Sequence, residues 1–378
     1  MEAQKYVWEG AIPLQIHLHE SEVTSLPPPP PALILAPRIG YLPLLLPLIK
    51  PYFSSALPPG QDTLWFDYKG LPLKWYIPTG VLFDLFCAEP ERPWNLTVHF
   101  RGYPSNLLIP CEGEESVKWS FINSLKEADY IINGNCKNVM NMSQSDQVEL
   151  WRSVMDGNLD KYLRASSKLK LGTLATDEGD MAGQVKAGKI PIRLYVRSVH
   201  EDFEDLEDAT EIENWDQISY INRPVEIHKE EEMTPLIAVS VFLCDPSVYL
   251  CGGETFLRSK HSCKYFTLHD ALRTLLPEFF GVKSLISDES CGEEGEDAQK
   301  VSSEDVGSNA GGEEGKEILN QLLESSCTSN DAEIKLVRIQ GIEPKLEIPF
   351  SWVVNNLKNP EHFLHICVCV KVPNVNAA

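Results

Sequence analysis

The sequence predicts an α+β protein in which one small domain occurs twice, once near each end of the chain. Each copy opens on a strand whose apolar residues alternate with polar ones, over residues 11–18 and 189–196. A period of two places one face of a strand on a core and the other face in water. The apolar positions are Ile12, Leu14, Ile16 and Leu18 in the first copy and Ile190, Ile192, Leu194 and Val196 in the second.

Two further features follow in the same order in both copies. A turn glycine precedes an Ile-Pro pair and an apolar run by seven residues, with Gly70 and Ile77 in the first copy and Gly341 and Ile348 in the second. Each copy then ends on one more strand, at 94–100 and at 363–370. The order of strand, return strand, helix, turn-rich strands, short helix and last strand is typical of a ubiquitin-like β-grasp. We therefore interpret the chain as a duplication of that domain.

The first copy needs a helix over residues 41–53, but proline recurs there every four residues. Pro43, Pro47 and Pro51 occupy these positions. A proline inside a helix removes a backbone hydrogen bond and clashes one turn back. We therefore expect a kinked or partly unwound helix.

A hairpin is predicted after this helix. Residues 65–68 and 73–76 are the two expected strands, and Gly70-Leu71-Pro72 is the expected turn between them. Glycine and proline are the residues that most often shape such turns.

Residues 112–170 predict a helix-rich domain between the two copies. Apolar residues recur at spacings of three and four, as in an amphipathic helix. A second helix is expected to begin at Asp146, with Glu149 three residues later forming a capping box. The apolar positions are Val117, Phe121, Leu125, Ala128 and Ile132 in the first helix, followed by Val148, Trp151, Met155, Leu159, Tyr162 and Leu163.

The chain is therefore expected to contain two ubiquitin-like β-grasp domains flanking a helix-rich domain. Insertions at 233–263 and 288–317 lengthen the second ubiquitin-like domain. The insertion at 233–263 is apolar and cysteine-rich, and we expect it to project from the domain without contributing to its core. The expected parts are 1–105 for the first domain with an N-terminal segment, 112–170 for the helix-rich domain, 171–188 for a linker and 189–372 for the second domain.

The net charge of −22 is concentrated in two stretches. Residues 200–217 carry nine acids and no Lys or Arg, and residues 288–317 carry eleven acids against Lys300 and Lys316. Such runs are typical of solvated, disordered segments. The remainder is nearly neutral and lacks the clustered basic residues that phosphate binding needs, so nucleic acid is not an expected partner.

Cysteine usage and hydropathy indicate the compartment. The ten cysteines form no framework and no signal peptide follows Met1, which favours a reducing cytosol. The richest apolar runs, 42–49 and 236–244, are much shorter than the roughly 18 residues that a spanning helix needs. We therefore expect a cytoplasmic protein.

The sequence contains no clear catalytic constellation, and we expect no catalytic residue, metal site or cofactor. A pair of histidines on one strand could contact a metal, but two solvent-facing side chains are the simpler interpretation. One group of cysteines and histidine lacks the CxxC pair of a zinc site, and one cysteine lacks a positioned base. No glycine pair has the setting of a phosphate loop. These candidates are His17 and His19; Cys251, His261 and Cys263; Cys87; Gly252-Gly253 and Gly311-Gly312.

Six motifs, in this order, resemble the autophagy protein 5 family. The resemblance covers about 5–170, 189–229 and 264–372, and the insertion at 233–263 is absent from the family pattern. The motifs are Leu64–Trp75, Gly80–Leu85, Pro93–Phe100, Lys126-Glu127-Ala128-Asp129, Gln340–Glu347 and Phe363–Ile366.

The resemblance implies a non-enzymatic autophagy scaffold. The C-terminal glycine of the ubiquitin-like autophagy protein 12 would be joined to one lysine by an isopeptide bond, with the help of conjugating enzymes. The conjugate would bind a helix of autophagy protein 16 in a groove between domains. It would then act like a ubiquitin ligase in the lipidation of autophagy protein 8, as a peripheral protein on the phagophore membrane during autophagosome formation.

The resemblance places the acceptor at Lys126, in the Lys-Glu-Ala-Asp motif. At 100° per residue, Lys126 lies about 140° from the centre of the apolar stripe of its helix, so it is expected to face solvent or a partner. Two other functions remain open: a cysteine transferase of the conjugation pathway, and a lipid-binding adaptor without a covalent partner.

Overall fold

The computed structural model describes residues 2–57, 60, 63–87, 90, 92–169, 171, 188–200, 212–227, 265–279 and 333–372. Both expected insertions, 233–263 and 288–317, lie outside these residues, as does nearly all of the expected linker. The same is true of Cys251, His261, Cys263 and the two glycine pairs.

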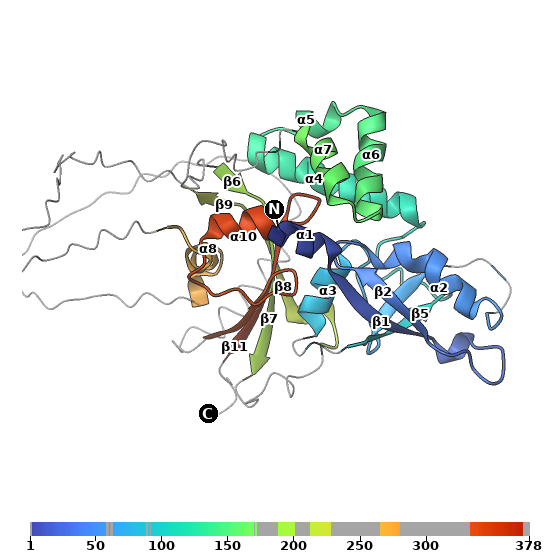
Figure 1. The fold of residues 1–378 in the computed structure, drawn as a ribbon. Coiled ribbons are helices and arrows are strands. Elements are labelled where there is room, and N and C mark those ends of the chain that lie inside the picture. The colour runs from blue at the N-terminus through green and yellow to red at the C-terminus, as the bar shows by residue number, and fades with distance from the viewer. Residues whose placement is uncertain are drawn as a thin grey trace, which may run out of the picture.

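The first sheet has the β-grasp order β2-β1-β5-β3-β4 (Figure 1). β1 is parallel to β5 and antiparallel to β2, and β3 is antiparallel to both β5 and β4. The alternating apolar residues of β1 are buried, as predicted. The elements are α1 (Glu2–Glu9), β1 (Ala11–Leu18), η1 (Glu20–Glu22), β2 (Ala32–Pro37), β3 (Trp65–Tyr68), β4 (Leu71–Pro72) and β5 (Trp94–His99).

The proline-rich segment is a partly unwound helix, as predicted. Residues Leu42–Leu45 form the 3-10 turn η2, and α2 (Leu46–Phe53) continues from it. Pro47 lies in the first turn of α2, where its missing N–H has no helical partner to lose. Buried Ile49 and Phe53 fix this short helix on the sheet, and α3 (Thr79–Phe86) is buried in the same core.

The first strand of the predicted hairpin is confirmed, but its return strand was placed two residues too late. Lys69 and Gly70 have φ of 52° and 86°, so they form the turn themselves. Leu71 and Pro72 belong to the return strand β4, and residues 73–76 contain no strand. Two consecutive positive φ values are typical of the tightest hairpin turns, which suit glycine at the second position.

The helix-rich region contains α4 (Glu114–Asn133), α5 (Lys137–Met140), α6 (Gln144–Met155) and α7 (Leu159–Ser167). Val117, Phe121 and Leu125 are buried on α4, as predicted. The start predicted at Asp146 was wrong, because Ser143 caps α6 by accepting a 3.1 Å hydrogen bond from the Asp146 amide. Gly157, with φ of 62°, ends this helix, and α7 begins two residues later, after its N-cap Asn158.

The second sheet repeats the first in the order β10-β11-β7-β8, with β7 parallel to β11. The expected strand over 189–196 is broken at Pro191, and its first part pairs with β9 in a separate ribbon. The elements are β6 (Gly188–Ile190), β7 (Ile192–His200), η4 (Trp215–Gln217), β8 (Ile218–Asn222), β9 (Val225–Ile227), α8 (Leu268–Leu275), η5 (Pro277–Phe279), β10 (Glu333–Arg338), α10 (Phe350–Leu357) and β11 (Leu364–Val372).

These elements confirm two ubiquitin-like β-grasp units flanking a helix-rich region. β1, β2, β3 and β5 correspond to β7, β8, β10 and β11, with the same parallel central pair. In Figure 1 the helices drawn in green lie over the junction between the two units. Among the described residues, no helix has both the length and the apolar character needed to cross a membrane.

One prediction about the second sheet was wrong. Its first strand was expected to expose a polar face, but Tyr195 and Arg197 are only 4% and 6% exposed. The reason is that this face packs against the first unit, where Tyr195, Ile218 and Cys367 join the apolar core. The two units therefore share a buried interface.

A buried ion pair of the first unit lies at the same interface. The Arg38 guanidinium donates to Asp84 of α3, and the backbone amide of Gly341 donates to the same Asp84 oxygen at 2.7 Å. Gly341 has φ of 75°, which suits glycine. The turn of the second unit thus approaches the first unit closely enough for backbone-to-carboxylate bonding.

Candidate attachment site and adjacent groove

Lys126 lies on α4, on the side away from the core residues Leu125 and Ala128, and is partly exposed. Its ammonium donates a 3.4 Å hydrogen bond to Asn123 Oδ1 and lies 5.9 Å from the ring centroid of Trp119. In the described part of the chain, no carboxylate lies within ion-pair distance of it. The amine is therefore not paired with an acidic side chain of the described residues.

Glu127, the next residue, fixes α4 to the second unit. Its Oε2 accepts a 2.7 Å hydrogen bond from Arg193 Nη2, and its Oε1 accepts one from Asn222. Arg193 also donates to Ser124 at 3.2 Å and stacks 3.9 Å from the ring centroid of Phe363. A charge-assisted pair with two further contacts holds the guanidinium in one orientation. The helix is thus anchored one residue away from Lys126.

Ala128 and Asp129 complete the motif from inside the helix-rich region. Both are fully buried. Asp129 accepts hydrogen bonds from the side chains of Asn133 and Asn138, at 2.8 and 3.0 Å, and from the backbone amide of Val139 at 3.1 Å. The Asp129 carboxylate thus pairs one of the backbone amides that the first turn of α5 leaves without a helical partner. Three of the four motif residues therefore hold the helix in place, and Lys126 alone points outward.

A groove of about 490 Å³ opens beside Lys126, at the junction of all three parts of the chain. Trp119 and Asn123, which contact Lys126, line it from α4. The first unit contributes Trp75, and the second contributes Trp215 and Tyr220. The aromatic side chains give the groove largely apolar walls with polar edges.

Lys74 lines the groove, and its ammonium group also lies over an aromatic ring. It lies 4.3 Å from the ring centroid of Trp215, and Trp215 Nε1 donates a 2.8 Å hydrogen bond to the carbonyl of Pro72. Burial lowers the pKa of Lys74, and nearby Asp216 opposes this by raising it. Lys74 and Lys126 therefore each lie over an indole ring at this junction.

The other candidate residues make contacts that stabilise the fold. His17 bonds to Gln15 at 3.0 Å, and His19 Nδ1 bonds to Ser21 Oγ at 2.7 Å. Cys87 is buried. Among the residues that the structure describes, no three His, Cys, Asp or Glu side chains are arranged to hold a metal ion.

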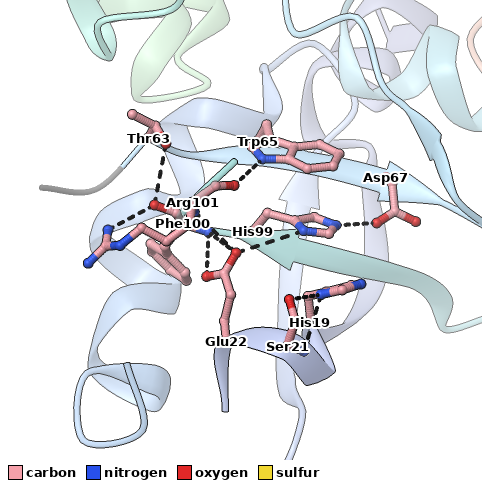
Figure 2. A network of polar contacts seen from close by, with 9 residues as sticks. All are labelled: His19, Ser21, Glu22, Thr63, Trp65, Asp67, His99, Phe100 and Arg101. Carbon is pink, nitrogen blue, oxygen red and sulfur yellow. Dashed lines mark hydrogen bonds and ion pairs between the residues drawn. The ribbon is translucent and has the colours of Figure 1, made fainter. Parts of the chain in front are cut away.

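A buried polar network at the end of β5 is also structural (Figure 2). Glu22 accepts hydrogen bonds from the backbone amides of Phe100 and Arg101, at 2.8 and 3.1 Å. His99 lies between Glu22 and Asp67, and its ring stacks 3.7 Å from Trp65. These groups bind one another and the backbone, which fixes the end of the strand.

Sequence reasoning singled out Lys126 but missed Glu127, Asp129 and Arg193. A detectable signal existed for the two acids, because they flank an apolar residue that belongs to the core stripe of a helix. Acids so close to a buried face need donors from neighbouring elements. Arg193 carried no such signal, since its partner lies 66 residues away in sequence.

Three family models match successive parts of the chain. They are "Autophagy protein ATG5, UblA domain" over residues 7–100, "alpha-helical bundle region" over 114–172 and "UblB domain" over 254–368. The chain is 58% identical to autophagy protein 5 of Arabidopsis thaliana, over 98% of both chains. It is 52% identical to that of Oryza sativa subsp. indica, over 98% of this chain and 94% of that one.

A solved structure shares the fold. The crystal structure of Kluyveromyces marxianus Atg5 superposes with a TM-score of 0.55 over 97% of this chain and 99% of that chain. Only 17% of the aligned residues are identical, so this likeness concerns the fold alone.

Proposed function

Because the chain belongs to the autophagy protein 5 family, a non-catalytic scaffold component of autophagy, we propose that Lys126 is its attachment point for autophagy protein 12. Conjugation to autophagy protein 12 and binding of autophagy protein 16 are general functions of this family. The supporting observation is the placement of Lys126 on α4, where it points outward while the other residues of its motif are tied down.

The reaction requires a neutral amine. Lys126 Nζ must lose a proton and attack the carbonyl carbon of the modifier's C-terminal glycine, held as a thioester on a conjugating enzyme. The new C–N bond forms as the C–S bond breaks, and the thiolate leaves with the enzyme. The described surroundings of Lys126 are an amide oxygen and an indole ring, so the base that takes up the proton is expected from the conjugating enzyme.

The substitution Lys126→Arg tests the acceptor. It keeps the positive charge and the aliphatic stem, but a guanidinium does not lose its proton to become a nucleophile. The expected result is loss of the heavier adduct in the mass of the protein from cells, with an unchanged melting temperature. Lys118→Arg on the same helix, where Lys118 pairs with Glu115 at 3.6 Å, is the matched control. Adduct of normal abundance in Lys126→Arg would show that the acceptor is another residue.

For autophagy protein 16 we propose docking as an amphipathic helix at a joint between the three parts of the chain. Apolar helix faces commonly bind such grooves. Binding should not depend on the covalent partner, so Lys126→Arg protein should capture autophagy protein 16 as well as the unaltered chain does. Loss of capture in that variant would show that conjugation creates the binding surface.

We also propose that the protein acts in the cytoplasm and reaches the phagophore membrane peripherally, where the conjugate promotes lipidation of autophagy protein 8. The support is the membership of the chain in the autophagy protein 5 family. Vesicle flotation should recover the assembled complex with the membrane and leave this chain alone in solution. Flotation of the chain alone would favour the lipid-binding adaptor instead.

We propose domain limits that follow the described elements. The first sheet and its helices end at His99, α4 to α7 end at Ser167, and the second sheet ends at Val372. Limited proteolysis should cut first between these parts. The limits are 1–105, 112–170 and 189–372, with a linker at 171–188.

A further inference from the structure

We propose that the connection between β1 and β2 carries a docking ridge, residues 26–31, for a protein module that binds polyproline in an aromatic-lined groove. The ridge consists of Leu26 followed by five consecutive prolines. The attachment site and the groove described above lie elsewhere, on α4 and at the junction beside it.

The connection that carries the ridge is longer than the fold requires, and both of its ends are fixed. Residues 19–31 join two paired strands, whereas about two to five residues are enough to close a hairpin. The amide and the hydroxyl of Thr24 donate hydrogen bonds of 2.9 and 2.7 Å to the carbonyl of Ala56. Ala32 pairs with Ile16 of β1. The ridge is therefore held between two anchors on the first unit.

The prolines restrict the ridge to one conformation. Each ring holds φ near about −65°, and a residue that precedes a proline avoids the helical region. A run of such residues forms a left-handed polyproline II helix with about three residues per turn. In agreement with this, residues 28–31 belong to neither a helix nor a strand. A preformed segment loses little conformational freedom on binding, which favours its use as a ligand.

The outer edges of the ridge face solvent. Residues three apart share an edge of a polyproline II helix, and Pro27 and Pro30 are both exposed, as is Pro28. Pro29 is partly buried, whereas the Leu26 side chain is 95% exposed. In Figure 1 the connection lies at the end of the first unit that is farthest from the second unit. An outward P-x-x-P pattern of this kind is the form that SH3, WW and EVH1 domains bind.

The surroundings of the ridge are apolar and uncharged, which narrows the kind of module that fits. No Asp, Glu, Lys, Arg or His occurs from Val23 to Pro37, and Leu33 and Leu35 of β2 are 64% and 67% exposed. Because proline lacks an N–H, the polar groups of the ridge are carbonyl oxygens, to which indole N–H and phenol O–H groups can donate. The complementary partner is therefore an aromatic groove with such donors and an apolar pocket beside it.

Titration calorimetry of the full chain with a purified EVH1 domain and with a purified WW domain tests the proposal. At least one of the two modules should bind with a Kd below about 1 mM. The double substitution Pro28→Ala/Pro30→Ala removes rings from both outer edges and should raise this Kd at least about tenfold. Pro58→Ala/Pro59→Ala is the matched control, because it alters the other pair of adjacent prolines in the sequence. It should change the Kd by less than about twofold.

Two further measurements separate the ridge from other causes of binding. Leu26→Ser changes an exposed side chain outside the core, so it should keep the melting temperature of the unaltered chain and raise the Kd about threefold. Binding at an uncharged ridge should be nearly independent of salt, whereas attraction to the net charge of −22 is screened. The proposal is overturned if neither module binds at concentrations up to about 1 mM. It is also overturned if the ridge variants bind as well as the control variant, or if high salt abolishes binding.

Discussion

Arg193 of the second β-grasp unit donates a 2.7 Å hydrogen bond to Glu127, the residue that follows the candidate acceptor on α4. The Arg193 side chain is 14% exposed and the Glu127 side chain 39%. The contact therefore joins two parts of the chain in a partly dry environment, where a charge-assisted hydrogen bond is worth more than on the open surface.

Removing this contact should destabilise the junction. Glu127→Ala leaves a buried guanidinium without its carboxylate, and we expect the free energy of unfolding to fall by about 1–3 kcal/mol in urea titrations. Glu226→Ala removes a comparable ion pair with Lys189 at 3.2 Å, but both side chains are about half exposed. That control should cost less than about 1 kcal/mol. Equal losses would mean that the contact of Arg193 with Glu127 stabilises the fold no more than the exposed ion pair does.

The phase of α4 predicts opposite behaviour for two neighbouring residues. Leu125 is fully buried, so Leu125→Ala should lower stability by about 2–4 kcal/mol through loss of transfer free energy and creation of a cavity. Lys126→Ala, on the outer side, should cost well under about 1 kcal/mol. Thermal melts of the two variants test this prediction. Similar melting temperatures would show that the wrong face of α4 has been assigned to the core.

Gly341 should tolerate no side chain. A Cβ there would lie 2.8 Å from Arg38 Cζ and Nη1, and the guanidinium cannot retreat freely because Asp84 holds it. Gly134 provides the control, since its φ of 71° is similar but nothing lies within 4 Å of its Cβ position. Gly134→Ala should cost about 1–2 kcal/mol for the backbone alone. Gly341→Ala should cost clearly more in the same unfolding experiment, and equal costs would contradict the close approach.

Acid should weaken the fold through two buried histidines. Burial lowers the pKa of His362, which neighbouring Lys358 lowers further, and burial also lowers the pKa of His365 against the opposing effect of Glu361. Below about pH 6.5 the unfolded chain binds protons that the folded chain does not. The free energy of unfolding should therefore fall with decreasing pH, by up to about 1.4 kcal/mol per pH unit for each histidine.

His362→Asn isolates one of these groups. Asparagine tolerates the positive φ of 67° at this position and does not titrate. The variant should show a shallower loss of stability between neutral and mildly acidic pH, measured by urea unfolding across the pH range. Curves that run parallel to those of the unaltered protein would show that His362 contributes nothing to acid sensitivity.

The sequence predicted the strands and helices well where one periodicity dominates. The alternation at Ile12 to Leu18 and the stripe from Val117 to Leu125 both became buried faces. The return strand after Gly70 begins two residues earlier than predicted, because Lys69 and Gly70 form the turn. Composition does not reveal the positive φ of Lys69. Contacts between distant segments, such as Arg193 with Glu127, left no local pattern to detect.

The burial of Tyr195, Ile218 and Cys367 against the first unit makes the two copies unequal. The outer sheet face of the second copy is already occupied from within the chain, whereas Leu33 and Leu35 of the first copy remain 64% and 67% exposed. The equivalent sheet face is therefore an internal interface in one copy and an open surface in the other. Substitutions at that interface must suit both copies, so the two copies cannot diverge independently there.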